Sequence, residues 1–411
     1  MEGLSLRNED IQEIAKKMAS YNLCDPCLGR QFAKVGHGMS NRERGKKIRE
    51  YFGLPFKEEC WLCDGLMDEI EKFSEMVIEA LDEYEYDTFL IGSKVEEDIL
   101  RKEAEIGSLT PYGESIKQEI NREVGKLVEK KTKKEVDFIR PHITAIVNTI
   151  YNVIELDVRS IYISGRYKKL KRGIPQTKWY CRKCRGLGCD YCNNTGKMYE
   201  ESVEEIIAAK VMELTKAKEE YFHGAGREDI DVLMLGNGRP FILEIRMPKK
   251  RSIDLSILQK MINDYGKGKV EVSDLNWAEK KDIERLKSAK WDKTYRAIIK
   301  MERKGKINEA VRALRGYTIH QRTPSRVTHR RADKIRKRKI HDIYIEEEKM
   351  NEITLVIKAE SGTYIKELIT GDEGRTVPSL SEIAGCAIEV KQLDVIKIGD
   401  KNGEKIEGNQ K

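Results

Sequence analysis

The sequence of 411 residues lacks the features that mark several large classes of protein. It has no run of about 18 apolar residues, so we expect no transmembrane helix. Its first residues, MEGLSLRNEDIQEIAKKM, mix acids, bases and scattered apolar side chains, which is not the pattern of a secretory signal. Proline is scarce at nine residues and aromatic residues make up 7%, yet hydrophobic residues reach 39%. This composition excludes collagen-like and disordered chains and predicts a globular protein of two or three domains.

Charge is abundant but unevenly placed, since 36% of residues are charged and the net charge is only +7. From Trp291 to Ile340 there are seventeen Lys and Arg against four Asp and Glu, a net of +13, which leaves −6 for the rest of the chain. A solvated charge run is the simpler interpretation of such a segment. This one is internal and interleaved with Tyr295, Tyr317, His320 and His329, which favours binding to nucleic acid.

Eight of the nine cysteines form four C-x-x-C pairs. Two thiolates three positions apart can bind one tetrahedral Zn²⁺, and two such pairs complete a closed structural site without an open position for substrate. Free buried cysteines and redox dithiols are the alternatives. Without an export signal, this usage predicts a reducing, cytoplasmic setting. Four residues join the pairs of CRKCRGLGCDYC, and 32 residues separate the other two pairs. The two predicted zinc sites are Cys24, Cys27, Cys60 and Cys63, and Cys181, Cys184, Cys189 and Cys192; Cys386 is expected to be a buried free thiol.

Apolar periodicity predicts a mixed order of helices and strands. A capping-box pattern, Ser202 with Glu205, should begin a helix that reaches about residue 221. The runs DVLML and RPFILEI on either side of GNG predict a hairpin with its turn at 236–238. We therefore expect an α+β protein with a mixed, largely antiparallel sheet flanked by helices, preceded by an amino-terminal α/β part. Helices are expected at 9–20, 42–52, 94–105, 114–131, 256–265, 278–289 and 307–314.

The segment GAGREDID, residues 224–231, is the candidate catalytic loop. Its glycines allow close approach of the backbone, and Arg227 lies two positions before Asp229. A carboxylate beside positive charge can be held ionised and aimed into a cleft. R-x-D is a weak signal by itself, because many junctions between loop and strand carry a solvated Asp.

The order of the motifs GREDID, LGNGRPFILEI, KTYRAIIK, QRTPSRVTHRRAD and GTYIKEL resembles the pseudouridine synthases of the archaeal and eukaryotic type, which act on the T-arm of tRNA at positions 54 and 55. The motifs cover roughly residues 160–411, and the amino-terminal cysteine pairs fit the RNA-binding accessory domain of that family. The resemblance implies a zinc-binding helical part at 1–86, a THUMP-like RNA-binding part at 87–165 and a catalytic domain at 166–411 with a zinc knuckle at 181–192. The partner it implies is tRNA, without a membrane or an obligate protein partner.

The resemblance also implies roles for single residues. Asp229 corresponds to the catalytic aspartate, with Asp231 as its competitor. Arginines of the basic segment are suited to bidentate phosphate contacts. The residues implied to contact substrate are Arg227, Tyr295, Tyr364, Ile365, Lys366 and Leu393, and those expected to bind RNA are Arg322, Arg326, Arg330, Arg331, Arg336 and Arg338.

Two other readings of the sequence compete with this one. A non-catalytic, zinc-containing RNA binder or chaperone is suggested by CRKCRGLGC and CNNTG, which resemble the cysteine repeats of J-domain chaperones, but there is one such cluster and no HPD triplet. A THUMP-linked methyltransferase or thiolation enzyme needs a Gly-rich cofactor loop or a pyrophosphatase loop after a strand, and neither occurs. We therefore expect structural zinc and no organic cofactor.

Overall fold

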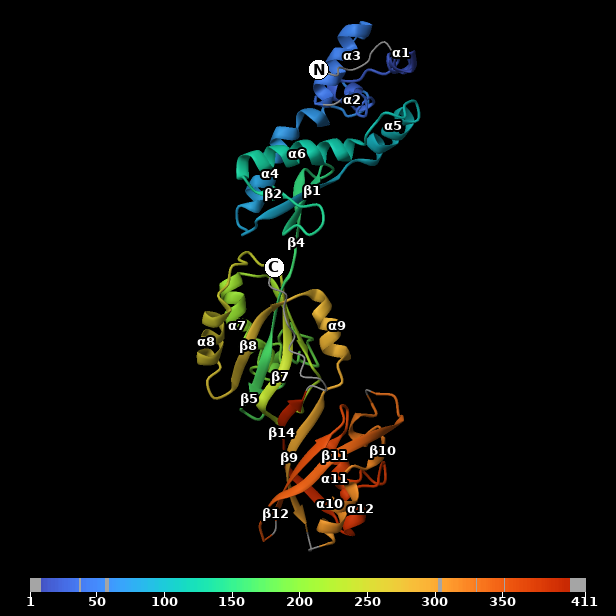
Figure 1. Ribbon diagram of the computed structural model, residues 1–411. Coiled ribbons are helices and arrows are strands. Elements are labelled where there is room, and N and C mark those ends of the chain that lie inside the picture. Colours follow the sequence, from blue (N-terminus) through green and yellow to red (C-terminus); the bar gives the residue numbers. More distant parts are fainter. Residues whose placement is uncertain are drawn as a thin grey trace. The chain divides into compact units, whose positions relative to one another are not determined.

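The computed structural model describes residues 9–36, 38–55, 59–301, 305–329, 331–350 and 352–399. The chain divides into two compact units, which are described separately below. Unit 1 comprises Met1–Arg159 with Met247–Arg251, and unit 2 comprises Ser160–Arg246 with Ser252–Lys411. Figure 1 labels their elements.

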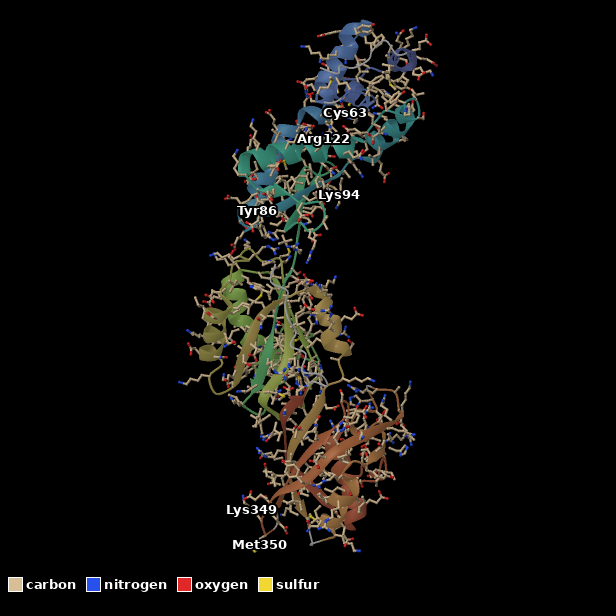
Figure 2. All side chains as sticks on the ribbon, viewed as in Figure 1. Cys63, Tyr86, Lys94, Arg122, Lys349 and Met350 are labelled. Atoms are coloured by element: carbon tan, nitrogen blue, oxygen red, sulfur yellow. The ribbon has the colours of Figure 1, made fainter. Side chains whose placement is uncertain are left out.

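Unit 1 is built around a four-stranded sheet in the order β2-β1-β3-β4. Strand β1 is parallel to both of its neighbours, and β3 is antiparallel to β4. Lys94, the last residue of β1 and labelled in Figure 2, forms an ion pair with Glu155 of β4 at 2.6 Å. The strands are β1 (Thr88–Lys94), β2 (Glu135–Val136), β3 (Ile143–Asn148) and β4 (Val153–Val158), and the helices are α1 (Glu9–Met18), α2 (Asp25–Arg30), α3 (Asn41–Phe52), η1 (Leu66–Asp68), α4 (Ile70–Leu81), α5 (Glu97–Gly107) and α6 (Ile116–Thr132).

Local sequence explains why helices form at and around the first cysteine cluster. Helix α6 begins at a capping box formed by Ser115 and Gln118, and its buried apolar residues recur every four positions and pack toward β1. Helices α2 and α3 lie against each other through two glycines. A Cβ atom on Gly29 would lie 1.8 Å from the Asn41 carbonyl oxygen, so only glycine permits this approach.

Unit 2 contains a ten-stranded sheet in the order β13-β10-β11-β12-β9-β14-β7-β5-β8, with β6 paired to β7. Among the described residues every paired set of strands in it is antiparallel except β7 with β14. This confirms the predicted α+β class with a mixed, largely antiparallel sheet. The strands are β5 (Ile161–Lys169), β6 (Glu219–Gly224), β7 (Leu233–Arg246), β8 (Val270–Ala278), β9 (Asp292–Met301), β10 (Thr318–Arg322), β11 (Ile335–Glu348), β12 (Glu352–Ala359), β13 (Thr376–Val377) and β14 (Ile388–Gly399).

Helices cover this sheet. Most of its buried apolar residues form one large cluster, and Ala225, Ile242 and Leu286 form a second, smaller one. Helices α7 and α8 pack on β8, and α9 packs on β6 and β7. Helix α11 packs on β14, which brings its first residues to the strand that adjoins β7. The helices are η2 (Asp190–Cys192), α7 (Val203–Thr215), α8 (Leu255–Tyr265), α9 (Lys280–Ser288), α10 (Ile307–Leu314), η3 (Ser325–Val327), α11 (Ile365–Thr370) and α12 (Leu380–Ala384).

Two expectations about this unit are wrong. The GNG segment is not a hairpin turn, because β7 runs through it without reversing. Gly236 and Gly238 instead allow neighbouring strands to lie close to β7. A Cβ atom on Gly236 would lie 1.8 Å from the Ile396 carbonyl oxygen of β14. Helix α7 is capped by Ser202 as predicted but ends at Thr215, before the strand β6 that pairs with β7.

No helix of the described segments is long and apolar enough to span a bilayer.

Candidate active site

The segment between β6 and β7 carries Asp229 at the surface of unit 2. Its side chain is 45% exposed, so the carboxylate is accessible. The segment turns tightly, with the Val232 amide donating to the Asp229 carbonyl at 3.1 Å. A loop that must present one carboxylate accurately needs its backbone carbonyls fixed.

A buried polar network fixes this loop from below. Lys169 of β5 is fully buried, and its Nζ donates to the carbonyls of Asp229 at 3.0 Å and Ile230 at 3.2 Å. Arg239 Nη1 donates to the Ala225 carbonyl at 2.8 Å, and Gln176 Nε2 donates to the Gly226 carbonyl at 3.0 Å. Four backbone carbonyls of the loop therefore accept hydrogen bonds from side chains that belong to the sheet or lie beside it.

Glu228 joins these groups into one network. Its carboxylate is fully buried and lies 2.8 Å from Arg239 Nε and 4.0 Å from Lys169 Nζ. The Tyr167 hydroxyl donates to it at 2.9 Å, and burial raises the pKa of Tyr167 well above its usual value, which keeps that donor protonated. Burial also lowers the pKa of Lys169. One carboxylate between two buried cations is the arrangement expected where charge must be satisfied internally.

Three charged side chains surround the exposed Asp229 carboxylate. Arg326 Nη1 donates to Asp229 Oδ2 at 3.2 Å, and Lys366 Nζ lies 3.8 Å from the same oxygen. The closer partner of Lys366 is Asp231, whose Oδ2 lies 2.8 Å from Nζ. Burial by itself would raise the pKa of Asp231, but the hydrogen bond and charge of Lys366 outweigh it and lower that pKa.

Apolar residues from three elements line the region beside this loop. Tyr295 of β9 stands opposite Val395 of β14, and Ala297 opposite Leu393, so Tyr295 and Leu393 share one face of the sheet. Leu393 and Ile365, at the start of α11, are buried. Burial raises the pKa of Tyr295 to about 12, with Arg239 opposing and the charge of Asp229 adding to the rise, which reflects how near this phenol is to the loop.

The remaining residues implied to contact substrate lie around the same loop. The Arg227 guanidinium lies 5.0 Å from the ring centre of Trp179, within cation–π range. Tyr364 precedes α11, and its backbone amide and carbonyl are both bonded to Gln321. Its hydroxyl accepts from Arg331 Nη1 at 3.1 Å.

The basic segment presents its arginines in two different ways. Arg322 and Arg331 are exposed, and Arg322 pairs with Asp333 at 2.7 Å. On β11, Arg336 donates to the Thr323 hydroxyl at 3.0 Å, and Arg338 is half-buried near Glu360. Arg322 and Arg331 are therefore more available to phosphates than Arg336 and Arg338, which are half-buried. Arg330 lies outside the described residues.

Each predicted cysteine set gathers into one group that could hold a metal ion. In unit 1, Cys24 Sγ and Cys63 Sγ are 3.7 Å apart, and in unit 2 the Cys181–Cys189 and Cys184–Cys192 sulfurs are 3.8 Å apart. Zinc–sulfur bonds of about 2.3 Å in a tetrahedron require sulfur–sulfur edges of about 3.8 Å, so four thiolates in this arrangement fit Zn²⁺.

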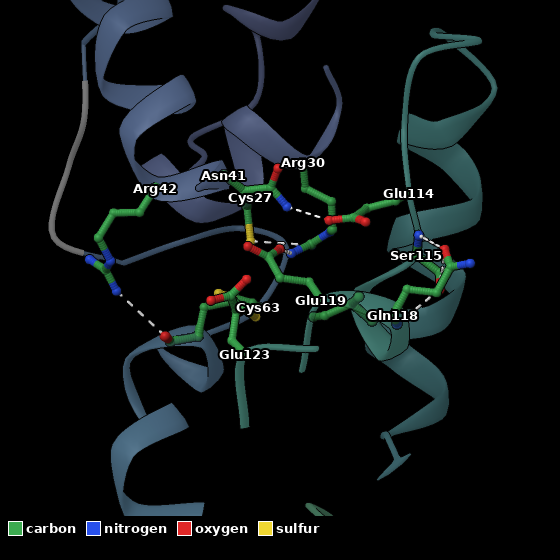
Figure 3. Close-up of polar contacts among 12 residues, drawn as sticks. Cys27, Arg30, Asn41, Arg42, Cys63, Glu114, Ser115, Gln118, Glu119 and Glu123 are labelled. Carbon is green, nitrogen blue, oxygen red and sulfur yellow. Dashed lines mark hydrogen bonds and ion pairs between the residues drawn. The ribbon is translucent and has the colours of Figure 1, made fainter. Parts of the chain in front are cut away.

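The groups around these sulfurs also suit thiolates. Arg30 is fully buried between Cys27 and Glu119, donating to the Cys27 sulfur at 3.4 Å and to Glu119 Oε2 at 2.8 Å (Figure 3). In the knuckle, the amide of Gly188 donates to Cys184 Sγ at 3.2 Å. Such donors offset negative charge on metal-bound sulfur. Cys386 is free as predicted but only half-buried.

Sequence reasoning missed Lys169, Glu228 and Glu367. Lys169 stands in the basic run RYKKLKR, where nothing marks one lysine as buried, although the period-2 alternation of β5 puts it on the same face as Tyr167. Glu228 sits inside GRED and reads as a solvated charge. Glu367 reads as an ordinary helix residue, yet it is buried and bonded to Arg326 at 2.6 Å.

Comparison with known proteins identifies the family. Residues 162–399 match the family model described as "Pus10, C-terminal", and residues 73–148 match "Pus10 THUMP domain, archaeal". Proteins named tRNA pseudouridine synthase Pus10 are similar over nearly the whole chain. That of Methanothrix thermoacetophila is 39% identical over 93% of both chains, and that of Methanocaldococcus jannaschii is 42% identical over 96% of both. That of Methanothermobacter marburgensis is 43% identical over 92% of this chain and 95% of its own.

Solved structures give a more distant likeness. A chain of a Cbf5-Nop10-Gar1 complex is 15% identical with a TM-score of 0.32, covering 58% of this chain and 50% of its own. A chain of an archaeal box H/ACA sRNP Nop10-Cbf5 complex has a TM-score of 0.28 at 13% identity, covering 58% and 49%. The family models and the curated relatives confirm the resemblance found in the motifs. The chain is an enzyme that belongs to the Pus10 family of tRNA pseudouridine synthases.

Proposed function

We propose that this chain isomerises uridine to pseudouridine at positions 54 and 55 in the T-arm of tRNA, with Asp229 as the catalytic carboxylate. The observation that carries the proposal is the accessible Asp229 carboxylate on a loop fixed by buried hydrogen bonds, with Arg326 3.2 Å and Lys366 3.8 Å from its Oδ2. Tyr295 is close enough to feel the charge of Asp229, and Leu393 shares its face of the sheet, while Ile365 precedes Lys366 at the start of α11. One accessible carboxyl group beside apolar side chains suits a reaction that needs neither redox chemistry nor a metal-bound water.

The reaction breaks the bond between N1 of uracil and C1′ of ribose and forms a bond between C5 and C1′. The proton on C5 is lost and N1 gains one, so no external reactant is consumed. Asp229 can serve by attacking the sugar or the base, or by removing a sugar proton, and each route requires the carboxylate form. Asp231 is the runner-up for this role, and its closer pairing with Lys366 favours a supporting one.

The neighbouring residues act by holding the base. A target uridine must leave its stack at a cost of a few kcal/mol, and stacking on the face of Tyr295 can return about 1–3 kcal/mol. Ile365 and Leu393 exclude water, so that the freed uracil is retained between bond breaking and bond making. Arg227 and Tyr364 are proposed to contact the nucleotide from the loop and from the start of α11.

The basic segment is proposed to hold the tRNA backbone. Exposed Arg322 and Arg331, with Arg326 and Arg336, can neutralise phosphates near the target, and Arg330 and Arg338 belong to the same proposed set. Neutralising about six phosphates gives a slope of about −4 to −5 in log K against log salt. The match of residues 73–148 to an archaeal THUMP model supports an RNA-binding role for the predicted part at 87–165, before a catalytic domain at 166–411.

Both four-cysteine groups are proposed to hold structural Zn²⁺. With four thiolates each, neither leaves an open coordination position, so zinc would stabilise the predicted helical part at 1–86 and the knuckle at 181–192 and take no part in the reaction. The enzyme is proposed to act in the cytoplasm, where tRNA and a thiol-reducing environment coexist.

The test is incubation of the purified chain with unmodified tRNA transcript, followed by mapping of pseudouridine at each position. The proposal expects pseudouridine at 54 and 55 and none in a transcript with cytidine at both. Tight tRNA binding without pseudouridine at any position would instead support the alternative, a non-catalytic zinc-containing RNA binder. Pseudouridine elsewhere in the tRNA would keep the enzyme class and overturn the T-arm assignment.

A further inference from the structure

Hydrogen bonds anchor the segment that carries Arg326. Arg326 belongs to η3, and the preceding Ser325 is bonded to Asp372 through both its amide, at 2.9 Å, and its hydroxyl, at 2.6 Å. Thr323 is fully buried, and its hydroxyl donates to the Ala332 carbonyl at 2.8 Å. The direction of the Arg326 side chain is therefore set by the fold.

The Arg326 guanidinium bridges two carboxylates. Its Nε donates to Glu367 Oε1 at 2.6 Å, and its Nη1 donates to Asp229 Oδ2 at 3.2 Å. Glu367 is 6% exposed at its side chain, whereas Asp229 is 45% exposed. The buried carboxylate is thus the anchor, and the accessible one is the group being held. The fork of an arginine suits such a bridge, while a lysine offers a single point charge.

Lys366 does not fill the same role. Its Nζ is 3.8 Å from Asp229 Oδ2, beyond hydrogen-bond distance, and 2.8 Å from Asp231 Oδ2. The directional contact to Asp229 comes from Arg326. A second observation points the same way: Oε2 of Glu367 is buried and has no hydrogen-bond partner among the described residues. A buried carboxylate of this kind needs the charge of Arg326 beside it.

We propose that Arg326, held by Glu367, is the positioning residue that orients the Asp229 carboxylate for the reaction, and that Lys366 is committed first to Asp231. This inference rests on the proposed role of Asp229. It also changes the role of Arg326, which was expected to contact phosphate because it lies in the basic segment. An arginine that grips phosphate contributes to affinity, whereas one that orients the acid contributes to turnover.

The test compares Arg326→Gln with Arg322→Gln, a change at an exposed arginine of the same segment whose ion pair is to Asp333 and not to Asp229. Binding of tRNA is measured against salt, and single-turnover pseudouridine formation is measured at saturating enzyme. For Arg326→Gln we expect a dissociation constant within threefold of wild type, an unchanged salt slope and turnover lower by about 100-fold, the scale of a misplaced catalytic group. Arg322→Gln should reduce the salt slope by about 1.

Two further variants separate positioning from a general structural effect. Arg326→Lys should lose about 10-fold in turnover, because one ammonium cannot bridge both carboxylates. Glu367→Gln should slow turnover in the wild-type background and add nothing to Arg326→Gln. If Arg326→Gln folds poorly because Glu367 is left uncompensated, the double variant Arg326→Gln/Glu367→Gln removes both charges and should fold, bind tRNA and remain about 100-fold slow.

The inference would be overturned if Arg326→Gln weakened tRNA binding and lowered the salt slope but kept wild-type turnover at saturating enzyme. That result would show that Arg326 contacts a phosphate of the tRNA. Additive effects of the two substitutions would overturn the link through Glu367. A wild-type enzyme that forms no pseudouridine would instead overturn the proposed function, so the two failures are distinguishable.

Discussion

The buried network under the catalytic loop gives the sharpest stability prediction. In Glu228→Gln the side chain keeps its volume but loses its charge, and Arg239 and Lys169, both fully buried, lose their counter-ion. Removing one partner of a buried ion pair costs about 3–5 kcal/mol, because the remaining charge stays desolvated. We therefore expect the free energy of unfolding to fall by about 3–5 kcal/mol.

The measurement is thermal unfolding by calorimetry. For a domain of this size each kcal/mol lowers Tm by about 2–4 °C, so Glu228→Gln should melt roughly 6–20 °C below wild type. The matched control is Glu271→Gln, since Glu271 is 46% exposed and pairs with Lys168, the neighbour of Lys169, at 3.4 Å. An exposed pair is worth about 0–1 kcal/mol. Equal shifts in Tm for the two variants would refute the claim that Glu228 neutralises the buried cations.

The remaining predictions concern metal, pH and salt. Metal analysis should find two zinc ions per chain, and Cys27→Ser and Cys192→Ser should each lower the count by about one and lower Tm; an unchanged count in either variant would show that its group does not hold zinc. Burial raises the pKa of Tyr295 from 10.0 to about 12, so between these pH values the phenol stays protonated in the folded state and ionises in the unfolded state. The stability that Tyr295 contributes is therefore full below pH 10 and is lost between pH 10 and about 12. Urea unfolding should therefore show a steeper loss of stability over that range in wild type than in Tyr295→Phe, and parallel profiles would contradict the shift. In filter-binding assays Arg336→Gln should weaken the binding of tRNAs of different sequence to the same extent and reduce the salt slope by about 1. An unchanged slope would show that Arg336 does not contact phosphate.

The sequence was most informative where the signal is local. Ser202, predicted as a helix start, caps α7 by accepting from the Glu205 amide, and the spacing of the cysteine pairs predicts two groups whose sulfurs do come together. It was least informative where a contact spans the chain. The glycines of GNG fit a hairpin turn equally well, and only the approach of Ile396, some 160 positions away, explains why β7 runs straight through them.

The same limit applies to the site. The motif resemblance placed Lys366 among the residues that contact substrate and Arg326 among those that bind RNA, although both lie near the Asp229 carboxylate. Arg326 is nearer, and it is 97 positions from Asp229 and 41 from Glu367 along the chain. In a segment with seventeen basic residues, nothing local distinguishes the one that faces an acid from those that face solvent. That distinction depends on the tertiary fold.

The claim on which the account depends most is that one carboxylate, Asp229, performs the reaction. The direct test is pseudouridine formation in T-arm transcripts by Asp229→Asn and, in parallel, by Asp231→Asn, with tRNA affinity measured for both. We expect Asp229→Asn to bind tRNA like wild type and to form no pseudouridine, while Asp231→Asn still forms it. Pseudouridine made by Asp229→Asn would contradict the account, and its loss in Asp231→Asn alone would assign the reaction to Asp231.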